Sequence, residues 1–206
     1  PENVLLAPFR PRGRCFEHAL FDPSCSTGPP HVNALHWEAL LGWRRAVGRV
    51  CAFQFVREAR WRSLPKLMTG LVREELRALL TAGVEGVFTS VELGDWDVYE
   101  PNVLAWAAFS WNPNLGPDAF LLDYVDHRFE GAAESAERAL ALVEQAMGEF
   151  SRPGEAYPEG ERLEAALSLV ERARVELRGG MLLSPPGHVA RALGVWAANL
   201  EYALSL

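Results

Sequence analysis

Short apolar runs alternate with amphipathic stretches through the first half of the chain. The runs are nearly continuous and rich in β-branched and aromatic residues, which is typical of strands covered on both faces in a parallel sheet. Between the runs, apolar side chains at helical spacing indicate two helices, the second of which is stopped by Gly83. The expected strands cover residues 4–9, 50–56 and 86–91, and the expected helices cover residues 32–47 and 66–82. This β-α-β-α-β order predicts parallel strands with right-handed crossovers, in an open doubly wound sheet or in part of a β/α barrel.

The second half of the chain is helical in pattern. Candidate helices cover residues 103–110, 118–129, 133–150, 161–177 and 188–206, separated by Asn-Pro, Gly-Pro, Arg-Pro-Gly and Pro-Pro-Gly breakers. Residues 151–160 (SRPGEAYPEG) are the best linker candidate. Charges of both signs interleave after this linker, as they do on solvated helix faces. We therefore expect a small helical bundle after the strands.

Composition narrows the classes of function. With 206 residues, 49% of them hydrophobic, the chain can bury a core. Its net charge of −7 argues against a nucleic-acid surface, which needs clustered Lys and Arg. Three cysteines without CxxC spacing signal neither a disulfide framework nor a zinc site, so a reducing cytoplasm is the expected location. No apolar run approaches the roughly 20 residues of a membrane span. The run that begins at Val4 indicates either a compact strand-first fold or the later part of a longer chain.

Polar loops follow the three expected strands. In parallel α/β folds, function collects in the loops after the carboxyl ends of the strands. The candidate substrate-binding residues are therefore Arg12 and His18 after the first strand, Arg57 and Trp61 after the second, and Glu92, Asp95 and Trp96 after the third. Acidic side chains beside aromatic ones are typical of carbohydrate sites, because a flat apolar ring with a polar edge suits a pyranose.

These acidic and aromatic residues admit more than one interpretation. Glu92 and Asp95 would hydrogen-bond sugar hydroxyls or act as the paired carboxylates of glycoside hydrolysis. Alternatively, Asp95 caps the helix expected near Pro101. Trp96 is the best candidate for stacking on a sugar, whereas Trp106 is expected to fill the core and Trp111 to anchor the WNPN turn by packing.

His18 carries a weaker signal. It would serve as a ligand or as an acid/base, but a lone histidine is more often structural, and neither HxH nor HExxH accompanies it. Cys15 lies three residues before it in the same loop, and we expect no pairing of the two as nucleophile and base. Neither GxGxxG nor a P-loop pattern follows a strand, so the sequence predicts no nucleotide, metal or other cofactor.

The chain resembles a bacterial family of glycosidase-like domains of unknown function, whose barrels are similar to those of β-N-acetylhexosaminidases and α-glucuronidases. The segments that carry the resemblance are VLLAPFRPRGRCFEHALFDPSC, VCAFQFV, GVEGVFTSVELGDW and LAWAAFSWNPNLGPDAFLLDYVDHRFEG, and the resemblance covers about residues 4–133. The resemblance implies that the three strands are the last ones of a TIM-type (β/α)8 barrel whose rim faces a glycan. It also implies catalytic carboxylates after an earlier strand, before Pro1. The second strand departs from the family, because it has Phe53, Phe55 and Arg57 where a tyrosine-rich end is expected.

We therefore expect an α/β fold in which residues 1–132 form the C-terminal part of a (β/α)8 barrel and residues 133–206 form an α-helical C-terminal region. The expected function is that of a glycoside-hydrolase-like portion that acts on or binds a glycan, with the catalytic carboxylates outside this chain. The alternative is a noncatalytic carbohydrate-binding or assembly module whose unpaired sheet edge pairs with a partner chain, in a homo-oligomer or with an upstream barrel portion. Neither nucleic acid nor membrane is an expected partner.

Overall fold

A computed structural model describes residues 14–25, 32–54, 56, 66–90, 96–150, 159–184 and 187–204. Of these residues, 74% are helical and 6% lie in strands. The helices are α1 (Val32–Val47), α2 (Thr69–Thr81), α3 (Trp96–Trp111), α4 (Pro117–Phe129), α5 (Ala133–Phe150), α6 (Glu161–Leu183) and α7 (His188–Leu204), with a 3-10 turn, η4 (Glu130–Ala132), between α4 and α5. The strands are β1 (Cys51–Gln54) and β2 (Gly86–Thr89).

The strands β1 and β2 pair in parallel, and within the described residues they form a two-stranded sheet. Cys51 lies opposite Gly86 and Gln54 opposite Thr89, so the register runs without a break. Helix α2 makes the crossover between the strands. It ends where Gly83 adopts a φ of +75°, a left-handed conformation that glycine tolerates best. The parallel pairing expected for the second and third strands is confirmed.

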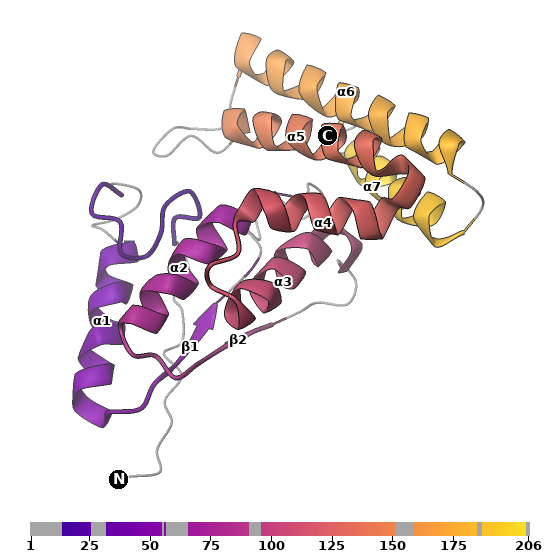
Figure 1. Ribbon diagram of the computed structural model, residues 1–206. Coiled ribbons are helices and arrows are strands. Elements are labelled where there is room, and N and C mark those ends of the chain that lie inside the picture. The colour runs from indigo at the N-terminus through magenta and orange to yellow at the C-terminus, as the bar shows by residue number, and fades with distance from the viewer. Residues whose placement is uncertain are drawn as a thin grey trace.

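The helices are grouped around the strands and at the far end of the molecule from them (Figure 1). Helices α1 and α2 pack beside the strands, where Leu40, Val50, Ala52, Leu79 and Val84 form a small apolar cluster. Helices α5, α6 and α7 form a second group, and α3 and α4 lie between it and the strands. Within the described ranges, no helix is both long enough and apolar enough to cross a membrane.

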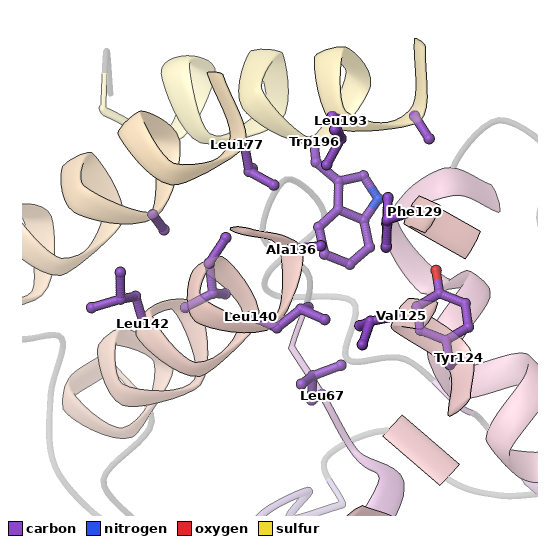
Figure 2. Packing of buried hydrophobic residues seen from close by; sticks show 14 of the residues in the cluster. Leu67, Tyr124, Val125, Phe129, Ala136, Leu140, Leu142, Leu177, Leu193 and Trp196 are labelled. Carbon is purple, nitrogen blue, oxygen red and sulfur yellow. The ribbon is translucent and has the colours of Figure 1, made fainter. Parts of the chain in front are cut away.

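The main core lies among α2 to α7. Figure 2 shows Trp196 of α7 beside Phe129 of α4, and the ring centroids of the two residues are 5.8 Å apart in an edge-on arrangement. The same cluster extends from Val56 to Leu200, so helices on both sides of residue 133 share one core. Most of the apolar surface removed from water therefore belongs to helices.

The expected partial (β/α)8 barrel is wrong. The described residues are mostly helical and hold a two-stranded sheet, not about three strands of a barrel. Each described strand has four residues, and Val56, which the sequence places in the second strand, is buried in the helical core. The strand expected at residues 4–9 lies outside the described residues.

Candidate functional site

A group of buried polar side chains lies at the carboxyl end of β1. The group, here named the strand-end cluster, comprises Arg14, Glu17, Gln54, Lys66, Glu75 and Trp106. Arg14, Gln54, Lys66 and Glu75 are each at most 7% exposed. Burying charge is costly unless it is paired, so such a group demands specific partners. The carboxyl end of a parallel strand is also where α/β folds place their binding sites.

Glu75 of α2 is the centre of the strand-end cluster. Its carboxylate forms an ion pair with the Arg14 guanidinium, and the two side chains are 5% and 1% exposed. The same carboxylate accepts the Leu20 N–H at 3.1 Å and the Gln54 amide N–H at 3.0 Å. Gln54 in turn accepts the indole N–H of Trp106 at 3.2 Å. One network thus joins residues 14–25 to β1, α2 and α3.

Lys66 and Asn102 hold the backbone segment that directly precedes α2. The Lys66 ammonium pairs with the Glu17 carboxylate. Asn102, only 1% exposed, donates its amide N–H to the Lys66 carbonyl at 2.7 Å and accepts the Met68 N–H at 2.8 Å. These bonds satisfy backbone groups that would otherwise be buried without partners, and they tie the entrance of α2 to α3.

The strand-end cluster is balanced in charge. Glu75 is matched by Arg14 and Glu17 by Lys66. Charge-assisted bonds of this kind are short and directional, so they hold a carboxylate in place. Glycoside hydrolysis needs one carboxyl group that carries a proton to the leaving oxygen. The two glutamates are therefore suited to positioning the segment around residues 14–25 rather than to acid catalysis.

Trp96, at the amino end of α3, is held by a second network. Its indole N–H donates to Glu100 Oε1 at 3.2 Å. Glu100 Oε2 accepts the Tyr124 hydroxyl at 3.0 Å and Arg128 Nε at 2.7 Å. Burial, together with the negative charge of Glu100, raises the pKa of Tyr124, so its hydroxyl remains a donor to that carboxylate. The result is a half-buried indole in a fixed orientation.

A third group brings together Cys15, His18 and Cys25. Their Sγ and imidazole nitrogen atoms all lie within 4.8 Å of one another, and Cys15 Sγ is 3.3 Å from His18 Nδ1. Thiolate sulfur and imidazole nitrogen are the ligands that zinc prefers, so this group could hold a metal ion. The expectation that Cys15 and His18 do not face each other is wrong, because the turn after Cys15 brings the ring back to the sulfur.

Asn33 of α1 holds that turn in place. Its side-chain oxygen accepts the Cys15 N–H at 3.1 Å, and its amide donates to the Cys15 carbonyl at 3.2 Å and the His18 carbonyl at 3.0 Å. Asn33 is 1% exposed, so water has little access to the backbone groups that it bonds.

Replacing Asn33 by Ala is expected to lower the free energy of unfolding by about 1–3 kcal/mol, because buried backbone groups of the turn lose their partner. Urea denaturation of the variant measures the change. The control is Asn199→Ala, since among the described residues the Asn199 side chain bonds only a carbonyl of its own helix, that of Val195. Equal stability of the two variants would contradict the bracing role of Asn33.

The candidate residues of the sequence fall into two sets. Arg12, Arg57, Trp61, Glu92 and Asp95 lie outside the described residues. His18 and Trp96 are described, and they belong to different groups of contacts, the first with Cys15 and the second with Glu100.

The tryptophans further along the chain differ from one another. Trp106 packs against the main core, as expected, and also bonds Gln54. Trp111 is 92% exposed, so the expectation that it anchors the WNPN turn by packing is wrong. Trp111 is the last residue of α3, and its ring is exposed to solvent there.

Sequence reasoning missed Glu75 and the metal-ligating set. A signal existed for each. Glu75 lies three residues after Val72 and four before Leu79, in the apolar stripe of α2, where an acid is out of place unless it has a buried partner. The spacing Cys15-x2-His18-x6-Cys25 suits a short chelating turn, although it lacks the usual CxxC pair.

A pocket of about 140 Å³ lies away from these groups. It is lined mainly by apolar side chains of α2, β2 and α3, among them Leu76, Leu80, Val87 and Phe109. Gly86, the first residue of β2, also lines it, which places the pocket toward the amino end of that strand. Few polar groups line it, so it offers little for the recognition of a sugar.

Comparison with protein-family models, with curated proteins and with solved structures gave no match to this chain.

Proposed function

We propose that this chain is a glycoside-hydrolase-like portion that binds a glycan at the carboxyl end of its parallel strands. The proposal is carried by one observation, the fixed orientation of the half-buried Trp96 indole at the start of α3. Binding sites for small polar ligands combine an apolar surface with a few well-placed polar groups. Trp96 supplies the surface, and the acidic stretch that includes Glu92 and Asp95 directly precedes it in the sequence.

The network behind Trp96 supports a binding role. An indole that rotates freely loses entropy when a ligand stacks on it, whereas one held in place beforehand avoids that cost. Here the Glu100 carboxylate fixes the indole edge, and Tyr124 and Arg128 fix Glu100. Arg128 and Glu100 are 23% and 13% exposed, so their ion pair is weakly screened by solvent. The ring is therefore presented in one orientation.

Binding is better supported than hydrolysis by this chain alone. The glutamates of the strand-end cluster are matched by Arg14 and Lys66, which suits them to hold the segment around residues 14–25 in place. Catalytic carboxylates would then come from Glu92 and Asp95 or from outside this chain. We further propose a cytoplasmic location, because the three cysteines form no disulfide and thiols stay reduced there.

Replacing Trp96 by Ala is expected to weaken glycan binding by about 1–2 kcal/mol, roughly tenfold, as for other central aromatic contacts. Isothermal titration with oligosaccharides of N-acetylhexosamine and of uronic acid measures the affinity. Trp111→Ala is the matched control, because this indole is 92% exposed at the other end of the same helix.

Two results would contradict the proposal. One is that the unmodified chain binds neither class of oligosaccharide. The other is that Trp96→Ala and Trp111→Ala bind with the same affinity as the unmodified chain.

A further inference from the structure

We propose that Cys15, His18 and Cys25 bind a zinc ion, and this site is independent of the glycan-binding proposal. The ligand atoms of all three residues lie within 4.8 Å of one another. In a tetrahedral site with Zn–S bonds of about 2.3 Å and Zn–N bonds of about 2.0 Å, neighbouring ligand atoms are about 3.5–3.8 Å apart. The 3.3 Å between Cys15 Sγ and His18 Nδ1 is close to that separation.

Backbone hydrogen bonds hold the three ligands in place. Asn33 bonds the backbone at Cys15 and His18, which fixes the first two. A second turn places Cys25, whose N–H donates to the Asp22 carbonyl at 3.3 Å. The Asp22 carboxylate accepts the N–H and the hydroxyl of Ser24, at 2.8 and 2.6 Å, and so stiffens that turn. The ligands are thus positioned by bonds that the metal does not provide.

The chemistry of the ligand set favours zinc over the harder cations. Sulfur and imidazole select zinc and similar metals, whereas magnesium and calcium prefer oxygen. Cys15 and Cys25 are each 4% exposed, so a cation bound between their sulfur atoms would be shielded from solvent. The Glu17 N–H, 3.4 Å from Cys15 Sγ, donates toward this sulfur. Three protein ligands leave the fourth tetrahedral position to a water molecule.

The site would brace the segment that carries the strand-end cluster. Arg14 and Glu17 lie within the same turn as Cys15, and they reach Glu75 and Lys66. A zinc ion that joins Cys15 to Cys25 closes this segment on itself. We therefore expect zinc to stabilise the folded chain, since a ligand that binds only the folded state adds to its stability.

Cobalt substitution tests the site directly. Co²⁺ bound through thiolates gives charge-transfer absorption in the near ultraviolet and tetrahedral d–d bands in the visible. We expect one Co²⁺ per chain, displaced by one Zn²⁺. Loss of a group that only supports a ligand costs about 10–100-fold in metal affinity. We expect a larger loss of Co²⁺ affinity when a ligand itself is replaced, in Cys15→Ser, Cys25→Ser and His18→Asn. Cys51→Ser is the matched control, because Cys51 lies on β1 outside the group and its substitution should leave the spectrum unchanged.

Measurements on the unmodified chain keep the test decisive if a cysteine variant fails to fold. His18→Asn removes a half-buried side chain outside the main core, so this variant should fold while losing the metal. Absence of thiolate-to-cobalt absorption in the reduced, unmodified chain would overturn the proposal. So would equal loss of the spectrum in Cys51→Ser. Thiol titration of the denatured chain as purified should find three thiols after chelation, and finding one would show a Cys15–Cys25 disulfide in place of the metal.

Discussion

Replacing Glu75 by Gln is expected to lower the free energy of unfolding by about 3–5 kcal/mol, the usual cost of breaking a buried ion pair from one side. The amide oxygen can still accept the Leu20 N–H, but the amide NH2 group cannot accept the bond from the Gln54 NH2 group. The substitution also leaves the Arg14 charge buried without its counterion. Urea denaturation followed by circular dichroism measures the loss. The effect is large because both side chains are almost fully buried, so water cannot compensate.

The exposed pair of Arg49 and Glu85 provides the control. Its side chains are 55% and 42% exposed, so Glu85→Gln is expected to change stability by less than about 1 kcal/mol. A double variant, Arg14→Met with Glu75→Leu, should recover much of the stability lost in Glu75→Gln, because it removes both charges. Equal effects of Glu75→Gln and Glu85→Gln would contradict a buried network of charges in the strand-end cluster.

Replacing Trp196 by Ala is expected to cost about 3–5 kcal/mol of unfolding free energy, through lost burial and the cavity left behind. Trp196 is 2% exposed and lies against Phe129, between helices that come from different parts of the chain (Figure 2). The substitution should lower the midpoint of a single cooperative transition, because α3 and α4 share their core with α5 to α7.

Trp111→Ala is the control for this substitution, since it removes the same side chain from a position that is 92% exposed. Its effect should stay within about 0.5 kcal/mol. Two separate unfolding transitions in Trp196→Ala, with α1 to α3 unaffected, would contradict a core shared across residue 133.

Local sequence signals predicted many of the helices well. The bounds predicted for the helices at residues 32–47 and 133–150 are those of α1 and α5, because their apolar positions repeat at helical spacing and clear breakers flank them. Two other helices were predicted too short. The sequence predicts a helix start near Pro101, since proline favours the first helical positions, but α3 begins at Trp96 and continues through Pro101. Helix α6 runs on to Leu183 through Gly180, where a Cβ would come within 3.1 Å of Ser135 Cβ on α5. Close packing, and not a helix stop, accounts for that glycine.

The wrong prediction of a barrel and the missed polar site have one cause. Local sequence patterns carry no information on contacts between distant residues. Strand length is one example, because a run of apolar residues does not reveal that the Val56 side chain packs in the helical core. The contacts of the site are another case. Glu75 accepts from Leu20, which is 55 residues away in the sequence, and Asn33 holds a turn 18 residues before it. Such pairs become visible only once the helices are packed.

The indole N–H resonances of the tryptophans test the glycan-binding proposal most directly. The chain has seven tryptophans, and each gives its own signal in a proton–nitrogen correlation spectrum, which Trp→Phe variants assign. As an N-acetylhexosamine or uronic acid oligosaccharide is added, the proposal predicts a saturable shift of the Trp96 signal, while the signals of Trp111 and the buried Trp196 stay in place. A spectrum in which Trp96 does not move at saturating oligosaccharide, or moves no more than Trp111, would contradict it.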